Sequence, residues 1–317
     1  MTAPRTSRWI LPLLFLGLAA LLTALHGEWI NFGPKISARA ERHEQILTRS
    51  GEAPWVYRVA VPWAAEGLAP VFEAAGYPHR RALEHGYLGL RLVFTWSLFL
   101  LFYRWLGRWL PPPWPLVGTL LLAALHGPSY AFYWFQPDSA LDLALWAGAL
   151  VLAMSGRWAW VLPLMVLGGL NRETIAFVPF LYAALRWDDE PRGRLAWQVA
   201  AMLLAGGLAV LVVRTWVGPA GWAHGTTPLG MLQTNLTHGD WLGYALLFWG
   251  LLWAAPVLAW RESPPALRRI ALVLLPYLLL QLLFGRIREV RLLLPLAVAL
   301  VPMGLIWLKA RLPREEA

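Results

Sequence analysis

The chain has 317 residues, of which 58% are hydrophobic and 14% are charged, and its formal net charge is +9. This apolar share exceeds what the core of a soluble domain of this length holds, which excludes a soluble globular protein and predicts a membrane protein. The absence of cysteine excludes disulfides and thiolate metal sites, and basic residues scattered between apolar tracts argue against nucleic-acid binding.

Ten apolar tracts predict an all-α, polytopic transmembrane bundle that forms one integral membrane domain over residues 1–317. Tracts of about 20 residues cross a bilayer, and the shorter ones are included because their neighbours have spanning length. In chain order the tracts are Trp9 to His26, Gly86 to Leu106, Trp114 to Tyr130, Ser139 to Met154, Arg157 to Leu170, Thr174 to Trp187, Leu195 to Val217, Trp241 to Trp260, Ile270 to Phe284 and Leu292 to Leu308.

The basic residues predict how these tracts are oriented. They are concentrated in alternate connections, beginning with Arg5 and Arg8 before the first tract and ending with Arg311 and Arg314 after the last. Cytoplasmic connections of membrane proteins carry an excess of arginine and lysine, so both termini are predicted to be cytoplasmic.

The longest break in the hydrophobic pattern, residues 27–85, is too polar to span and is predicted to be an external loop. One helical stripe in its first half holds Ile36, Ala40, His43 and Leu47. A second amphipathic stretch opens at Pro62, with Leu68, Val71, Phe72 and Ala75 on one side. The loop is therefore predicted to contain two helices that lie on the membrane surface. Ordered loops of this length are typical of lids or binding elements.

The first candidate site is the segment Asn171-Arg172-Glu173, which lies between two short apolar tracts. A charge at bilayer depth is costly unless it is paired or hydrated, so an Arg-Glu pair there indicates function. Short tracts on both sides of a polar break often mark a binding site. The alternative is an external turn whose charges simply meet water.

The second candidate is the group Arg286, Arg288 and Arg291 at the external start of the last tract. Positive charge on the outside opposes the topology rule, which indicates an anionic partner. On a helix Arg288 and Arg291 share a face, and two guanidinium forks suit a phosphate or pyrophosphate. The alternative is that these arginines anchor the helix to ordinary phospholipid head groups.

The third candidate is a set of external carboxylates: Glu28 after the first tract, and Asp138 with Asp142 at the start of the fourth. Such groups accept a proton from an attacking hydroxyl or hold a divalent cation. Asp138 has an alternative role as a helix cap. Glu28 has no comparable local role and ranks first as a base. The external histidines match no compact metal motif, so no structural zinc is predicted.

Together, the N-in multi-pass pattern, the long first external loop, the acidic residue after the first tract and the external arginines resemble the GT-C superfamily of membrane glycosyltransferases. The stretch from Trp55 to Pro62 and the motif Asn171-Arg172-Glu173-Thr174 are also similar to uncharacterised bacterial membrane proteins grouped with those enzymes. The resemblance implies a bacterial inner membrane protein with a polyprenyl-phosphate sugar donor. It also implies an acidic base in the first external loop, a role that falls to Glu28.

The predicted function is therefore sugar transfer at the external face, with a lipid-linked sugar donor and membrane lipids as partners and no nucleic acid. Glu28 or Asp138 is expected to act as the base. The expected substrate-binding residues are Asn171, Arg172, Glu173, Arg286, Arg288 and Arg291. A requirement for a divalent cation is left open. The alternative from another class is a transporter or flippase of an anionic lipid-linked glycan, although transporters more often carry polar residues near the midplane.

Overall fold

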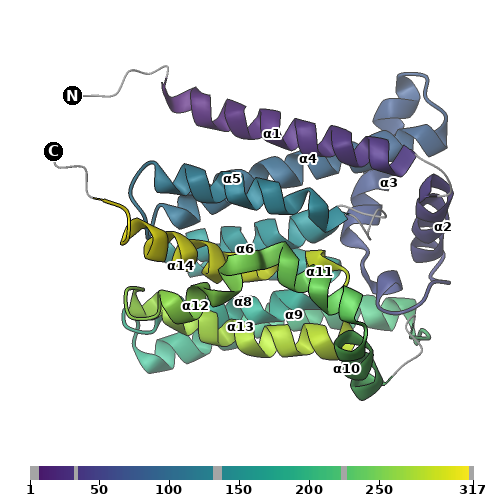
Figure 1. Ribbon diagram of the computed structural model, residues 1–317. Coiled ribbons are helices and arrows are strands. Elements are labelled where there is room, and N and C mark those ends of the chain that lie inside the picture. The colour runs from purple at the N-terminus through teal and green to yellow at the C-terminus, as the bar shows by residue number, and fades with distance from the viewer. Residues whose placement is uncertain (1–6, 32–34, 131–137, 223–226, 314–317) are drawn as a thin grey trace.

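The computed structural model describes residues 7–31, 35–130, 138–222 and 227–313. Over these ranges the chain forms α-helices and short 3-10 helices, and no β-strand. The long helices run side by side along one direction, and α1 begins at the same end of the bundle at which α14 ends (Figure 1). The predicted all-α class is confirmed.

The helices follow one another with short connections. The α-helices are α1 (Ser7–Asn31), α2 (Lys35–Leu47), α3 (Ala60–Ala74), α4 (His79–Leu106), α5 (Trp114–His126), α6 (Asp138–Met154), α7 (Val161–Asn171), α8 (Val178–Arg186), α9 (Arg192–Val217), α10 (Pro228–Thr237), α11 (Gly239–Trp249), α12 (Ala255–Leu258), α13 (Pro265–Phe284) and α14 (Ala297–Lys309). The 3-10 helices are η1 (Trp55–Tyr57), η2 (Pro128–Tyr130), η3 (Trp158–Trp160), η4 (Glu173–Phe177), η5 (Gly250–Ala254) and η6 (Val290–Leu296).

Six helical stretches in the described ranges are long and apolar enough to cross a membrane. They comprise most of α1, all of α4, α9 and α13, the broken run from α11 to α12, and η6 with α14. These stretches mark the chain as membrane-embedded. The other four predicted tracts correspond to shorter helices, so ten crossings stay a prediction.

The core of the bundle lies around α6 and the run from η6 through α14, whose side chains are nearly all buried. Both segments are apolar on all sides, as an enclosed helix requires, except at Asp138, Ser139, Asp142, Arg291 and Lys309. Two buried side chains donate to backbone oxygens here: the Trp105 indole to the Val298 carbonyl at 3.0 Å, and the Tyr277 hydroxyl to the Leu292 carbonyl at 2.5 Å. These bonds hold the start of the last helix against α4 and α13.

Helices α7 and α9 approach closely at Gly169. A Cβ at this position would lie 2.7 Å from the Gly206 carbonyl oxygen and 2.9 Å from the Ala209 Cβ. Gly169→Ala is therefore expected to lower the free energy of unfolding by about 1–3 kcal/mol, because backbone has to move to admit the methyl group.

Denaturation of the purified protein in mixed micelles measures this effect, and Gly207→Ala on α9 is the matched control. A Cβ at Gly207 meets nothing within 4 Å, so that variant is expected to be neutral or slightly stabilised. Equal losses in the two variants would contradict the close approach.

Helices α2 and α3 lie at the end of the bundle opposite the start of α1 (Figure 1). The sequence predicted both helices, and their position on a membrane surface stays a prediction. The predicted stripe of α2 holds for His43, which is buried, but Arg39 and Ile46 are buried with it, whereas Ala40 and Leu47 are half-buried; the Ile36 side chain lies outside the described residues. In α3 the predicted stripe is wrong for Val71, which is exposed. Hydrogen bonding accounts for the burial of His43, whose ring lies 2.7 Å from the Tyr87 hydroxyl and 2.8 Å from a Glu66 oxygen.

Candidate functional site

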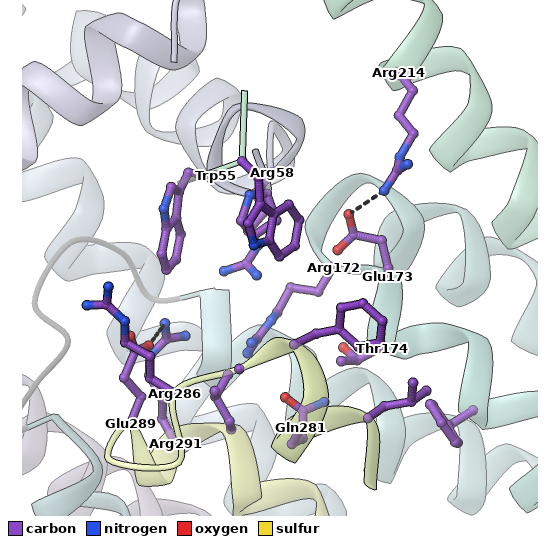
Figure 2. Close-up of a pocket in the computed structure, with 17 residues that line it drawn as sticks. Trp55, Arg58, Arg172, Glu173, Thr174, Arg214, Gln281, Arg286, Glu289 and Arg291 are labelled. Atoms are coloured by element: carbon purple, nitrogen blue, oxygen red, sulfur yellow. Dashed lines mark hydrogen bonds and ion pairs between the residues drawn. The ribbon is translucent and has the colours of Figure 1, made fainter. Parts of the chain in front are cut away.

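A cavity of about 340 Å³ lies among η1, η4, the last turns of α9 and α13, and the loop before η6 (Figure 2). This is the end of the bundle at which α2 and α3 lie (Figure 1). Its charged lining consists of five arginines and two glutamates: Arg58, Arg172, Arg214, Arg286, Arg291, Glu173 and Glu289. Its walls are otherwise mostly aromatic or aliphatic, so the charges meet in an apolar frame.

Asp138, the first residue of α6, lies behind the cavity and is fully buried. One carboxylate oxygen is 3.4 Å from an Arg58 nitrogen and 4.0 Å from an Arg291 nitrogen. Buried charges are tolerated when they are paired, and a carboxylate at a helix N-terminus also interacts favourably with the helix dipole. Asp138 therefore brings together two arginines that are far apart in the chain.

Arg172 is held beside this pair by a second buried carboxylate. Its guanidinium lies 3.8 Å from Asp142 and 3.3 Å from the Ser139 hydroxyl, which is also 3.1 Å from Arg291. The Thr174 hydroxyl lies 3.0 Å from both Asp142 oxygens and fixes that carboxylate. These contacts orient the guanidinium groups of Arg172 and Arg291 at the wall of the cavity.

Asn171 supports the site from behind, although the sequence placed it among the binding residues. Its side chain is buried, and its amide donates to the Asp138 carbonyl oxygen at 3.0 Å. It is not among the residues that line the cavity. This hydrogen bond to Asp138 joins the end of α7 to the start of α6 and so positions Arg172, the next residue of the chain.

The arginine group before the last helix differs from its predicted form. Residues 285–289 form a turn rather than a helix, so Arg288 and Arg291 do not share a helical face. The buried Asn235 side chain imposes this turn, donating to the Leu282 and Gly285 carbonyls at 2.8 Å and accepting from the Ile287 amide at 3.0 Å. As a result Arg286 and Arg291 line the cavity, whereas Arg288 is exposed and lies outside the lining.

Two carboxylates face the cavity itself. Glu173 pairs with Arg214 at 3.3 Å, and Glu289 pairs with Arg291 at 2.5 Å. Figure 2 shows the two pairs on opposite sides of the cavity. Glu173 is the more accessible, with 37% of its side chain exposed against 15% for Glu289.

Glu28 does not join this site. It is exposed near the end of α1 and lines a different cavity, of about 390 Å³, between α1 and α4. Glu28, which the sequence ranked first as the base, therefore lies apart from the arginine cavity. The position of Glu28 after the first tract can be read from the sequence. The face of the bundle on which its side chain lies depends on how α1 packs.

The charged residues of the cavity do not fit a divalent cation. Each of its carboxylates already pairs with an arginine, and arginines outnumber carboxylates in the lining. Within the described ranges no group of three or more His, Asp or Glu side chains has metal-binding geometry. Hard cations require several converging oxygen ligands, which this lining does not supply.

The sequence assigned no role to four residues that carry charge in the cavity or stack on its arginines: Trp55, Arg58, Arg214 and Glu289. The Arg58 guanidinium stacks on the Trp55 ring at 4.8 Å, and the Arg291 guanidinium lies 5.9 Å from the same ring. A single arginine inside the apolar run from Trp55 to Pro62 was the available signal for Arg58. Arg214 lies in the last turn of a spanning helix and carried no comparable signal.

The chain matches no protein-family model, and neither curated proteins nor solved structures contain a significant match to it. The resemblance to membrane glycosyltransferases therefore stands on its sequence motifs and predicted architecture.

Proposed function

We propose that the chain is a membrane glycosyltransferase that moves a sugar from a polyprenyl-phosphate-type lipid donor to an acceptor at the cavity end of the bundle. The observation that carries the proposal is the convergence of five arginines on one cavity. Guanidinium forks match phosphate oxygens in geometry and charge. In a bacterial inner membrane with cytoplasmic termini, this cavity would face outward.

Arg286 differs from the other arginines of the cavity, because no carboxylate of the described residues neutralises its positive charge. Arg58, Arg172, Arg214 and Arg291 each lie within 4.0 Å of an acidic oxygen. Arg286 is exposed, lines the cavity and forms no ion pair with any residue in the described ranges. An anionic head group would complete the cavity's charge balance at this position.

The apolar wall of the cavity favours the proposal that the substrate is attached to a lipid. Leu280 and Phe284 of α13 line the cavity and are 39% and 46% exposed on the bundle surface. A second, smaller cavity shares Trp222 and Phe284 with the first and continues along apolar side chains. A phosphate bound by the arginines would thus have its hydrocarbon chain beside the membrane-facing surface of α13.

In the proposed reaction the acceptor hydroxyl oxygen bonds to the anomeric carbon while the bond from that carbon to the phosphate oxygen breaks. The hydroxyl proton passes to a carboxylate, and polyprenyl phosphate leaves with the electron pair of the broken bond. Preorganised arginines lower the barrier because negative charge grows on the departing phosphate.

We assign the base to Glu173, because it is the more accessible carboxylate of the cavity and its partner Arg214 is 52% exposed. Asp138 is enclosed between arginines and acts as a positioning residue, although the sequence ranked it as a base. Glu28 lies in another cavity. Asn171 and Glu289 are assigned to support around the binding site, and Arg288 lies outside the cavity lining.

A transporter or flippase would use the same arginines without breaking a bond. The two functions are separated by incubating the purified protein with radiolabelled polyprenyl-phosphate sugars and a mixed acceptor pool. Release of free polyprenyl phosphate supports transfer. Binding of the donor without release, in every sugar tested, would contradict it.

Arg286→Gln is expected to weaken donor binding about 10- to 100-fold, the factor that corresponds to one charge-assisted contact. Because Arg286 is exposed and has no partner among the described residues, the variant should fold normally. Fluorescence titration with a short-chain polyprenyl phosphate measures the affinity.

The matched control is Arg81→Gln, an exposed arginine near the start of α4 that does not line the cavity. Arg288→Gln tests the rival assignment. If Arg288→Gln loses as much affinity as Arg286→Gln, the phosphate binds across the outside of the turn and not in the cavity.

A further inference from the structure

A wide groove lies at the opposite end of the bundle from the arginine cavity. It has a volume of about 890 Å³ and lies between α12 and α13, with α14 as its floor. Its size falls within the range of ligand pockets. Figure 1 shows these three helices side by side near the end of α14.

The groove lies beside a break in the span from α11 to α12. Gly250 has a φ of 49°, in the left-handed region that favours glycine, and it begins the 3-10 segment η5. After η5, α12 has only 4 residues, Ala255–Leu258. This short helix forms one wall of the groove, and Ala299 and Leu300 of α14 form its floor.

The groove is apolar along its length and basic at its mouth. Val257 and Leu275 on its walls are 80% and 61% exposed and lie on the outer surface of the bundle. Arg261, Glu262 and Arg311 lie at the mouth. Arg311 pairs with Glu262 at 3.1 Å, whereas Arg261 is exposed and forms no ion pair with any residue that the structure describes.

We infer that this groove binds one anionic phospholipid, with acyl chains along α13 and the phosphate at Arg261. Apolar walls beneath an unneutralised arginine match an amphiphile with a negative head group, and basic pockets between spanning helices bind such lipids. Trp260 at the mouth is typical of the interface between hydrocarbon and head groups. A partner helix fits less well, because close helix packing requires small residues and the exposed walls carry large aliphatic ones.

The inference is tested by native mass spectrometry of the full chain, purified in nonionic detergent and mixed with dioleoyl phosphatidylglycerol or dioleoyl phosphatidylcholine. The two lipids have the same acyl chains and differ in head-group charge. Phosphatidylglycerol is expected to be retained at least about fivefold more, the factor that one arginine contributes near an anionic head group.

Arg261→Gln is expected to abolish the preference for phosphatidylglycerol. Leu275→Trp, at an exposed wall position, is expected to fill the groove and reduce retention of both lipids. Arg157→Gln, an exposed arginine outside the groove, is the matched control and should keep the parental preference. Equal retention of the two lipids by the parent, or an unchanged preference in Arg261→Gln, would overturn the inference.

Discussion

Replacing Glu173 with glutamine is expected to slow sugar transfer by roughly a hundredfold or more while donor affinity stays near the parental value. Glutamine keeps the size and polarity of the side chain but cannot accept the hydroxyl proton, and general bases typically contribute on this scale. Glu173 lines the cavity, and 37% of its side chain is exposed. The loss should therefore appear in the rate of the chemical step rather than in binding.

Single-turnover transfer and donor titration, measured on the same preparations, separate the two effects. Asp189→Asn is the control, because Asp189 also pairs with an arginine, Arg186 at 3.0 Å, but lies outside the cavity. Two rivals are tested in parallel. If Glu28→Gln or Glu289→Gln loses the rate and Glu173→Gln keeps it, the base is that residue and the assignment of Glu173 is wrong.

Asp138→Ala is expected to lower the free energy of unfolding by about 3–5 kcal/mol, the usual cost of removing one partner from a buried ionic group. The side chains of Arg58 and Arg291 are only 10% and 2% exposed. Without the carboxylate, their charges would stay buried and lose a counter-ion. The variant should therefore be the least stable of the site variants.

Unfolding in mixed micelles measures the loss, and Asp188→Ala is the control. Asp188 pairs with Arg269 at 2.6 Å, but its side chain is 63% exposed, so removing it should cost less than about 1 kcal/mol. Asp138→Asn retains the shape of the side chain and should show an intermediate loss. Equal stabilities for Asp138→Ala and Asp188→Ala would mean that water reaches the arginines and that Asp138 is no buried counter-ion.

These two predictions divide the site into a chemical part and a supporting part. Glu173 faces the cavity and is expected to affect rate, whereas Asp138 lies behind it and is expected to affect stability. The sequence-based assignment had treated Asp138 as a rival base. Asp138 has the residue type of a base, but because it is buried we assign it a supporting role.

The sequence alone determined the all-α class and the membrane environment. Tracts of apolar residues as long as those in α9 and α13 form helices in a bilayer whatever their neighbours are, because every backbone group bonds within the segment. It also identified Arg172, Glu173, Arg286 and Arg291, which all line the cavity, because charge beside apolar tracts is costly wherever it lies.

The tertiary structure alone decided which of the candidates share a site. Glu28 and Arg288 have suitable chemistry and suitable positions along the chain, but the packing of α1 and the turn held by Asn235 direct them elsewhere. Arg58 joins the site because Asp138, 80 residues away in the chain, pairs with it. The periodicity of a sequence shows which residues share a face within one segment. The contacts that assemble this site form between segments, and the local pattern carries no information on how segments pack against each other.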